Sequence, residues 1–204
     1  MDLNKVLELN NILEEGGYSR KEIIGNSMQL KEQFHDLSTI IKEYRIENVL
    51  EIGFNAGHSS LIFLESSPNT RVTSFELVSG GYTKIGKTYV DATYPNRHTL
   101  IQGDSTVTIP EFIASRAERK FDLIFIDGGH DYEVAAADLR NCATLASKET
   151  IVIMDDTVYT RGWEAAYTTG PTRAWEEYLS EGKLKEIARK EYCPCRGMSW
   201  GQYC

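Results

Sequence analysis

The segment 48–59 constrains the fold more than any other part of the chain, because an apolar strand runs directly into a glycine turn and then into a helix. Residues 48–52 read Asn-Val-Leu-Glu-Ile, and Gly53 and Gly57 follow at a spacing of four. Glycine lets the backbone approach a ligand closely, and a helix start offers unpaired N–H groups. No Gly-x-Gly-x-x-Gly is present, which excludes the dinucleotide fingerprint. The segment predicts either a plain strand–helix corner or a ligand-binding one, and the downstream sequence favours the second.

Strands and helices alternate along the whole chain. Further strands are expected at 71–76, 98–102, 121–127 and 150–156, and helices at 2–15, 27–44, from 57, 80–94, 108–118, 131–146 and 172–181. Two final strands, at 183–191 and 198–203, are joined by a short turn. Such alternation requires right-handed crossovers between parallel strands. We therefore expect an α/β fold: a Rossmann-like, doubly wound, mostly parallel seven-stranded sheet with a C-terminal antiparallel hairpin.

Composition limits the classes of partner. The 204 residues fit a single domain, 1–204, and their formal net charge is −8. With no dense run of Lys and Arg, we expect no nucleic-acid partner and no anionic membrane. No apolar run approaches the roughly 18 residues of a membrane span, and the polar start is unlike a signal peptide. These features predict a cytoplasmic protein.

The cysteines give a weaker signal. Cys142 falls within a helical pattern and is expected to be a buried thiol. Cys193, Cys195 and Cys204 could form a zinc site or a disulfide, but no fourth ligand and no Cys-x-x-Cys accompany them. Reduced thiols in a cytoplasmic protein are the favoured interpretation, and the roles of these three cysteines stay open.

Acidic residues recur at the carboxyl ends of the predicted strands. Glu51, Glu76 and Asp127 each end an apolar run, and Asp155 and Asp156 end another. Asp104 follows the third strand after one glycine. Buried carboxylates without partners are costly. Ligands of open parallel sheets bind beyond the carboxyl ends of the strands. The recurrence of acids at this edge therefore predicts a functional site.

Glu51-x-Gly53-x-x-x-Gly57 resembles motif I of the class I S-adenosylmethionine-dependent methyltransferases. The resemblance implies that the acid and the glycine turn hold the methionine half of S-adenosyl-L-methionine. It also implies that Glu76 accepts the ribose hydroxyls and Asp104 contacts the adenine amino group, although each could instead cap a helix. Ser59 and His58 either face the cofactor or begin the helix, and His58 is expected to be a bystander. The predicted cofactor-binding residues are Glu51, Gly53, Gly57, Ser59, Glu76, Asp104 and Asp127.

The sharpest constellation is Asp127-Gly-Gly-His130 with Asp155-Asp156 after the next strand. Three carboxylates that meet at adjacent strand ends repel one another unless a cation lies among them. Hard oxygen ligands suit Mg²⁺ or a similar ion such as Mn²⁺. The alternative is that Asp127 orients the sulfonium side of the cofactor and Asp155 caps a helix. The pattern favours a divalent metal held by Asp127, Asp155 and Asp156.

The segments around Asp127 and Asp155 closely resemble a group of metal-dependent O-methyltransferases that act on macrolide sugars and other natural-product hydroxyls, over about residues 45–160. The resemblance implies that Asp127 is a ligand with a catalytic role and that His130 is the general base. Catechol-type enzymes usually carry Asn where this chain has Asp156, which weakens that assignment. No Asp/Asn-Pro-Pro-Tyr motif follows the fourth strand, which disfavours methylation of nucleic-acid bases.

The acceptor is predicted to be a hydroxyl of a sugar, glycan or related small molecule. The family usually builds its acceptor pocket from the N-terminal helices and from the segments after strands four and five. Here the N-terminal helices are 1–45, and they are expected to cover a core formed by 46–204. The expected lining residues are Tyr18, Asn26, Met28, Tyr132, Tyr159, Arg161 and Trp163, with Arg173, Trp175 and 196–200 further out. Trp175 also fits a core position. The alternatives are a catechol, phenol or metal-independent methyltransferase and a non-catalytic cofactor-binding module. The oligomeric state stays open, including a homo-oligomer.

Overall fold

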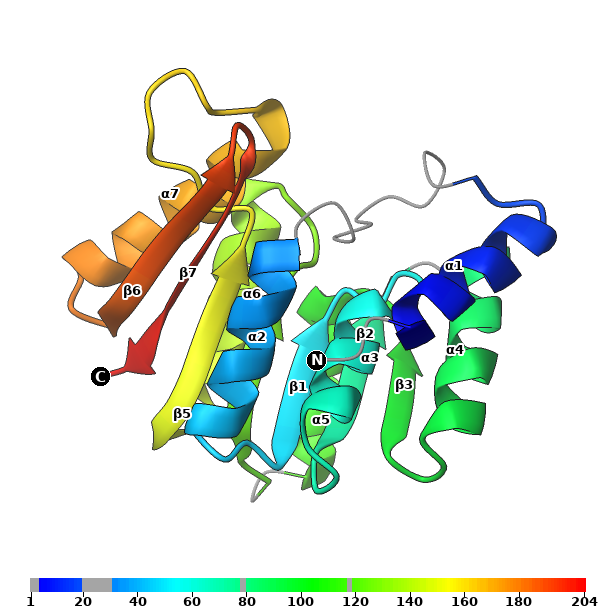
Figure 1. The fold of residues 1–204 in the computed structure, drawn as a ribbon. Coiled ribbons are helices and arrows are strands. Elements are labelled where there is room, and N and C mark those ends of the chain that lie inside the picture. Colours follow the sequence, from blue (N-terminus) through cyan, green and yellow to red (C-terminus); the bar gives the residue numbers. More distant parts are fainter. Residues whose placement is uncertain (1–3, 20–30, 78–79, 117–118) are drawn as a thin grey trace. The chain divides into compact units, whose positions relative to one another are not determined.

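The structure is a computed structural model that describes residues 4–19, 31–77, 80–116 and 119–204. Helices and strands alternate through it (Figure 1). The helices are α1 (Asn4–Glu15), α2 (Lys31–Glu43), α3 (His58–Ser66), α4 (Gly81–Thr93), α5 (Ser105–Arg116), α6 (Tyr132–Ala143) and α7 (Ala166–Ser180). The strands are β1 (Asn48–Ile52), β2 (Arg71–Glu76), β3 (His98–Gln102), β4 (Phe121–Ile126), β5 (Ala146–Asp155), β6 (Leu184–Cys193) and β7 (Arg196–Tyr203).

The seven strands form one sheet in the order β3-β2-β1-β4-β5-β7-β6. Pairing is parallel between β2 and β3 and between β4 and β5, whereas β7 runs antiparallel to both β5 and β6. The predicted Rossmann-like sheet with its C-terminal hairpin is therefore confirmed. The chain divides into two compact units, Met1–Val49 with Phe54–Gly103 and Leu50–Gly53 with Asp104–Cys204. The predicted domain boundaries stay a prediction.

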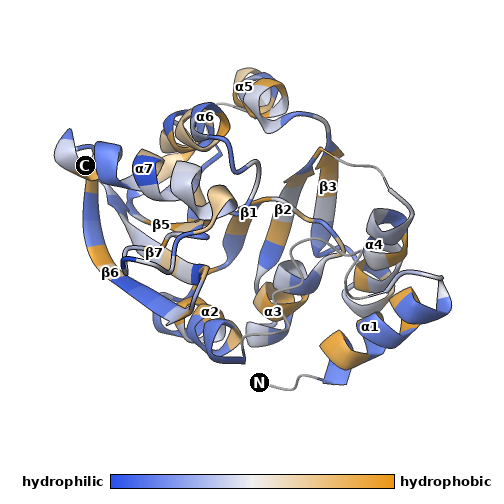
Figure 2. Ribbon diagram, turned by 90° about the horizontal axis from the view of Figure 1, so that it is seen from above, coloured by the Kyte–Doolittle hydropathy of each residue, from blue (hydrophilic) through white to orange (hydrophobic). Residues whose placement is uncertain are grey.

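The first unit contains β2, β3 and helices α1 to α4. The register of β2 and β3 runs from Val72 opposite His98 to Glu76 opposite Gln102, and Figure 2 shows hydrophobic residues along both strands. Helix α1 packs on α4, and α2 packs on α3. Helix α3 is buried on nearly every side, as expected for a helix beneath other helices. This packing fixes the start of α3, and with it the glycine turn.

The second unit is built on β4, β5 and the β6–β7 hairpin, with α6 packed between α5 and α7. Residues 121 and 123–126 of β4, and all of 150–155 in β5, are buried, as in strands covered on both faces. Trp175 is fully buried, and its indole N–H donates to Glu186 over 2.9 Å. The core position predicted for Trp175 is thus confirmed, and its role as an outer acceptor contact is disfavoured by burial.

Element boundaries differ from the sequence-based expectations at two helix starts and where α6 meets β5. Helix α6 ends at Ala143 rather than 146, and β5 begins at Ala146 rather than 150. Helix α5 begins at Ser105 rather than 108, because Asp104 accepts hydrogen bonds from the first turn. Helix α7 begins at Ala166 rather than 172, with Pro171 inside it. Its start is fixed by the Thr168 hydroxyl, which accepts from the Ala165 N–H over 3.0 Å. Proline signals a helix start, and it led the pattern to miss the first turn.

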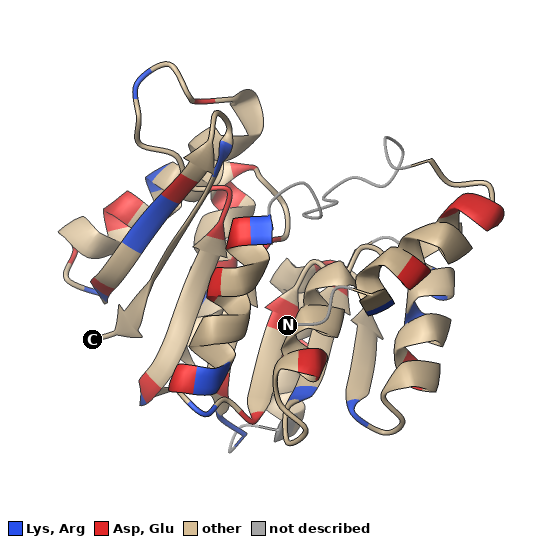
Figure 3. Ribbon diagram, in the orientation of Figure 1, with Lys and Arg blue, Asp and Glu red and all other residues tan. Residues whose placement is uncertain are grey.

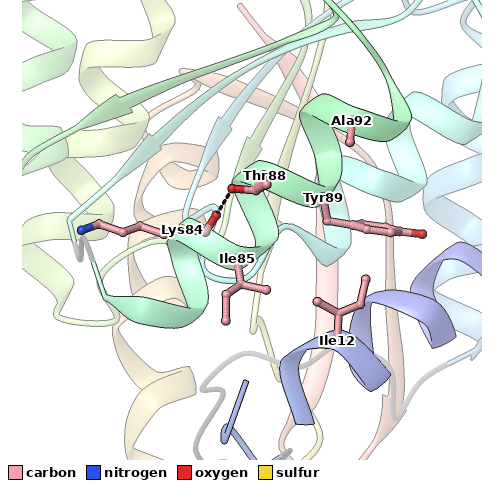
Figure 4. Close-up of a pocket in the computed structure, with 6 residues that line it drawn as sticks. All are labelled: Ile12, Lys84, Ile85, Thr88, Tyr89 and Ala92. Atoms are coloured by element: carbon pink, nitrogen blue, oxygen red, sulfur yellow. Dashed lines mark hydrogen bonds between the residues drawn. The ribbon is translucent and has the colours of Figure 1, made fainter. Parts of the chain in front are cut away.

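Among the described residues, every helix is too short or too polar to cross a bilayer. An apolar groove of about 460 Å³ lies on the first unit between α1 and α4 (Figure 4). It is lined by Ile12, Lys84, Ile85, Thr88, Tyr89 and Ala92. None of these residues was predicted to bind cofactor, metal or acceptor, so the groove supports none of those assignments.

Candidate active site

The glycine turn after β1 brings Asn55 against Glu76. Asn55 and Gly57 both adopt left-handed backbone conformations, with φ of 51° and 89°. A Cβ on Gly57 would lie 2.8 Å from the Phe54 ring, so only glycine fits there. The Asn55 N–H donates to a carboxylate oxygen of Glu76 over 2.5 Å. The turn and Glu76, the last residue of β2, are therefore joined by a hydrogen bond, and Glu76 is only 8% exposed.

In the second unit, the backbone of Gly53 lies directly against the backbone of Asp127, so this position also requires glycine. Its φ is 95°, and a Cβ there would lie 1.9 Å from the carbonyl oxygen of Asp127. The Asp127 N–H donates to the Ile52 carbonyl over 2.9 Å. Glycine at 53 is thus required for the packing of backbone on backbone, whatever ligand it also meets. Glu51 is fully buried at the end of the same strand.

His58 and Ser59 begin α3 and are both buried. Nε2 of His58 donates to the side-chain oxygen of Asn10 over 2.8 Å, and burial lowers the pKa of His58 to about 4. A neutral imidazole tied to α1 has a structural role, in line with the bystander expected. The cofactor role predicted for Ser59 stays a prediction.

Asp104 caps α5. Its Oδ1 accepts from the backbone N–H of Thr106 over 2.9 Å and from the Thr106 hydroxyl over 2.7 Å, and these bonds lower the pKa of Asp104. The capping alternative is therefore realised in the structure. The adenine contact stays a prediction, since one oxygen of the exposed carboxylate suffices for the cap.

The second unit gathers Asp127, His130 and Asp156 into one cluster. Each offers a ligand atom within 4.8 Å of the other two, which makes the group suitable for a metal ion. Figure 3 shows acidic residues at the carboxyl end of β5. Within the part of the chain that the structure describes, His130 completes this group in place of Asp155. Asp155, 6% exposed, is nevertheless close enough to raise the pKa of Asp127.

Two side chains, His130 and Arg196, hold the carboxylate of Asp156. Its Oδ2 lies 2.9 Å from Nε2 of His130, and its Oδ1 lies 3.6 Å from Nη1 of Arg196. The hydrogen bond to Asp156 raises the pKa of His130. Burial, followed by repulsion from Asp155 and Asp156, raises the pKa of Asp127 well above its usual range. Without a cation, the cluster therefore resists ionisation of all its carboxyl groups.

Backbone geometry fixes the cluster from both sides. Asp156 has a left-handed φ of 55° directly after β5, a conformation that turns the chain sharply. A Cβ on Gly170 of α7 would lie 2.1 Å from the carbonyl oxygen of His130, so helix and histidine turn are in close contact. Strain of this kind at a strand end is common at functional sites.

The acceptor residues predicted from the sequence are spread over both units. Asn26 and Met28 lie outside the described residues. In the first unit, the hydroxyl of Tyr18 occupies the space that a Cβ on Gly81 would need. In the second unit, Arg173 lies 3.9 Å from the ring centroid of Tyr132, and the Tyr159 hydroxyl lies 3.0 Å from Oγ of Ser199. Arg161 is exposed and Trp163 is half-buried.

Two features escaped the sequence analysis. Tyr167 lies edge-on to His130, with ring centroids 5.6 Å apart, and no motif marked it. Asp138 on α6 is fully buried, and neither of its carboxylate oxygens has a hydrogen-bond partner among the described residues. Its Oδ2 lies 3.3 Å from where a Cβ on Gly128 would be. A helical spacing of three from Ala135 and four to Cys142 places Asp138 on the apolar face, a signal that was available from the sequence.

Solved structures with the same fold are numerous, although no curated protein matches the chain in sequence. An O-methyltransferase from Bacillus cereus in complex with SAH is 18% identical with a TM-score of 0.78, covering 99% of this chain and 91% of that one. The O-methyltransferase TomG from Streptomyces achromogenes, of tomaymycin synthesis and in complex with SAM, is 14% identical with a TM-score of 0.75, covering 100% and 91%.

A TDP-rhamnose 3'-O-methyltransferase of calicheamicin biosynthesis is 18% identical with a TM-score of 0.59, covering 99% of this chain and 99% of that one. At these identities the likeness concerns the fold. A family model described as a methyltransferase domain matches residues 50–157, which run from within β1 to the residue after Asp156 and make up more than half of the chain. The chain therefore belongs to the methyltransferase domain family.

Proposed function

We propose that the chain is an S-adenosylmethionine-dependent O-methyltransferase that uses a divalent metal ion and methylates a hydroxyl of a sugar or related small molecule. The observation that carries this proposal is the meeting of Asp127, His130 and Asp156 ligand atoms within 4.8 Å. The carboxylate oxygens of this cluster are donors that suit Mg²⁺ or Mn²⁺, and His130 lies beside them as the candidate general base. The structural neighbours named in complex with SAH and SAM support the choice of cofactor.

The cofactor is assigned to the residues around the two glycine approaches and the acids beside them. Glu76, already aligned by the Asn55 N–H, accepts hydrogen bonds from the ribose hydroxyls in this proposal. Glu51, Gly53, Gly57 and Ser59 hold the methionine half, and Asp104 reaches the adenine amino group. S-adenosylmethionine supplies an activated methyl group, so the protein's task is to place the acceptor oxygen in line behind it.

A bound divalent ion supplies a Lewis acid that lowers the pKa of an acceptor hydroxyl. Asp127, Asp155 and Asp156 are its proposed ligands, with His130 near enough to join them. In the protein alone, Nε2 of His130 faces Oδ2 of Asp156. A neutral imidazole that donates from Nε2 keeps Nδ1 as a proton acceptor. His130 then removes the acceptor proton at Nδ1, and Asp156 fixes the tautomer.

The sugar acceptor rests on chemistry rather than on a defined pocket. Tyr132 with Arg173 and Tyr159 with Arg189 are aromatic–guanidinium pairs, with the cation 3.9 and 3.8 Å from the ring centroid. Such surfaces can stack on a sugar or bind an anionic substituent. One neighbour is named as a TDP-rhamnose methyltransferase, which supports a nucleotide sugar as the first acceptor to test.

A metal-independent methyltransferase is the second candidate. It is favoured by one specific observation, the ion pair between Arg196 and Asp156, because a guanidinium can supply part of the positive charge that the cluster needs. The two candidates agree on cofactor and fold. They differ in the effect of a chelator on turnover: it should abolish turnover by a metal-dependent enzyme and leave turnover by a metal-independent one unchanged.

The deciding experiment measures methyl transfer from labelled S-adenosylmethionine to a panel of nucleotide sugars and simple glycosides. EDTA should abolish turnover and Mg²⁺ or Mn²⁺ should restore it, while calorimetric binding of S-adenosylhomocysteine persists in EDTA. Asp127→Asn, Asp155→Asn and Asp156→Asn should each lose activity by weakening the ion site. Full activity in metal-stripped protein would establish the metal-independent candidate instead.

A further inference from the structure

Arg196 forms an ion pair with Asp156, one of the proposed metal ligands. Nη1 of its guanidinium lies 3.6 Å from Oδ1 of Asp156, and the two side chains are only 27% and 7% exposed. At such low exposure an ion pair is poorly screened by solvent. Asp156 is also proposed to bind a metal ion. Arg196 and the metal ion would therefore interact with the same carboxylate.

The backbone holds Arg196 in place on both sides. On one side, Cys195 has a left-handed φ of 64°, its N–H donates to the Trp163 carbonyl over 2.8 Å, and its carbonyl accepts from the Tyr167 hydroxyl over 2.8 Å. On the other side, Gly197 accepts from the Thr157 N–H over 3.1 Å. The tip of the hairpin is thereby tied to the segment that follows Asp156.

The ring of Tyr167 adds a second fixed contact. The Arg196 guanidinium lies 5.9 Å from its centroid, and the His130 ring lies 5.6 Å from it. Tyr167 therefore contacts both groups that bond to Asp156. The bonds of Cys195 and Gly197 fix the main chain at Arg196, and contact with the Tyr167 ring restricts the rotamers of its side chain. Its charge is aimed at the cluster and does not depend on an exposed, mobile pair.

We propose that Arg196 is a tethered cation that competes with the divalent ion for Asp156 and so sets how weakly the cluster binds metal. This inference rests on the proposed metal-assisted function. With no ion bound, the Arg196 guanidinium offsets the charge of Asp156, and His130 is hydrogen-bonded to the same carboxylate. When an ion binds, its charge and that of Arg196 repel each other across the same carboxylate, and the apparent affinity for the ion falls.

The test is calorimetric titration of the full chain with Mn²⁺ at fixed ionic strength, which needs no acceptor and no turnover. Arg196→Gln should tighten Mn²⁺ binding about tenfold, equivalent to about 1.4 kcal/mol. Arg196→Lys keeps a cation at the position and should stay within about threefold of wild type. Circular dichroism of each variant establishes that the hairpin still folds.

Arg189→Gln is the matched control. Arg189 lies on the neighbouring strand of the same hairpin, where it pairs with Glu186 over 2.9 Å and stacks on Tyr159. Its loss removes the same unit of charge without touching the cluster, so Mn²⁺ affinity should change less than twofold. A similar gain in both arginine variants would reduce the effect to net charge and overturn the proposal.

The remaining outcomes separate this inference from the proposed function. Unchanged or weaker Mn²⁺ binding in Arg196→Gln, with binding still abolished by Asp156→Asn, overturns the competition and leaves the metal site standing. Binding in Arg196→Gln but not in wild type supports the competition in its strongest form. No binding in wild type, Arg196→Gln or Arg196→Lys overturns both the competition and the metal-assisted mechanism.

Discussion

Two regions of this molecule satisfy their strand-end acids in different ways. The first region is the turn of residues 54–57 with Glu76, here called the glycine corner, which lies in the first unit. There Glu76 accepts a hydrogen bond from the backbone N–H of Asn55. In the cluster of the second unit, Asp156 is held by the charged or chargeable side chains of His130 and Arg196. The histidines follow the same division. Burial keeps His58 and His98 of the first unit neutral, whereas the pKa of His130 is raised by its hydrogen bond to Asp156.

The difference indicates what each region is able to bind. A carboxylate aligned by a fixed backbone dipole is prepared to accept hydrogen bonds from an uncharged group such as a ribose diol. Burial, and after it repulsion from Asp155 and Asp156, raises the pKa of Asp127. Positive charge relieves that repulsion. The first region therefore suits recognition, and the second suits a cation and proton transfer.

The largest expected effect comes from His130. If Nδ1 takes the acceptor proton, His130→Ala should lower kcat by roughly 10²–10⁴-fold. Binding of S-adenosylhomocysteine and Mn²⁺ should stay near wild type, because three carboxylates remain for the ion. Single-turnover rates across pH give the measurement, and the mutant should lose the rising limb that reflects deprotonation of an imidazole.

A different pattern would move His130 to the other side of the comparison. Loss of Mn²⁺ binding together with activity would make His130 a metal ligand, in line with its place in the cluster. Asp156→Asn gives a second readout in metal-free protein. It should lower the pKa of His130, measured by NMR titration, because the hydrogen bond that raises that pKa is weakened.

The next effect concerns the glycine corner. Glu76→Ala should weaken binding of S-adenosylhomocysteine by about 1.5–3 kcal/mol, or roughly 10- to 150-fold in Kd, through lost hydrogen bonds to a charged acceptor. Glu76→Gln keeps an oxygen for the Asn55 N–H and should lose less. Calorimetry on folded variants measures both. Unchanged affinity in Glu76→Ala would remove the ribose role and leave Glu76 as a structural partner of the turn.

The sheet, and the edge of it that carries the candidate site, could be predicted because both depend on patterns that are visible in the sequence. Apolar runs gave the strands, and acids that follow parallel strands must share an edge, so the meeting of Asp127 and Asp156 followed. That His130 lies within ligand distance of Asp127 and Asp156 depends on the course of the segments that follow β4 and β5, which no periodicity reveals. The approach of Arg196 depends on the hairpin register, with Cys193 opposite Arg196. Register within a hairpin is fixed by turn geometry rather than by pattern.

Asp138 supplies a third kind of acid, with no hydrogen-bond partner for either oxygen among the described residues. Burial raises its pKa to about 7, although the nearby Ser105 hydroxyl opposes the shift without meeting hydrogen-bond geometry. The folded state therefore binds a proton that the unfolded state releases near pH 4. Stability should fall as pH rises from about 4 to about 7 and then level off.

Asp138→Asn should remove that slope and stabilise the protein by roughly 1–3 kcal/mol at pH 8. Urea unfolding at several pH values measures the effect. Asp91→Asn is the control, because Asp91 is exposed and forms an i,i+4 ion pair with Lys87 on the surface of α4. It should change stability by less than about 0.5 kcal/mol. An unaltered slope in Asp138→Asn would mean that another buried group titrates there.

The smallest expected effect decides to which region Asp104 belongs. Like Glu76, Asp104 accepts a hydrogen bond from a backbone N–H, yet it lies in the same unit as the Asp127–His130–Asp156 cluster. Asp104→Ala should cost about 1 kcal/mol of stability at neutral pH through the lost cap. Because the folded pKa of Asp104 is lowered by Thr106, this difference should be full above pH 4 and should shrink as pH falls through the folded pKa. Asp104→Asn retains an oxygen for Thr106 and should keep most of the stability, but its NH₂ group donates where the carboxylate would accept.

An adenine contact therefore predicts that Asp104→Asn weakens S-adenosylhomocysteine binding about 3- to 10-fold with unfolding unchanged. Equal affinity in wild type and Asp104→Asn would make the residue a helix cap alone and confine adenine recognition to other groups.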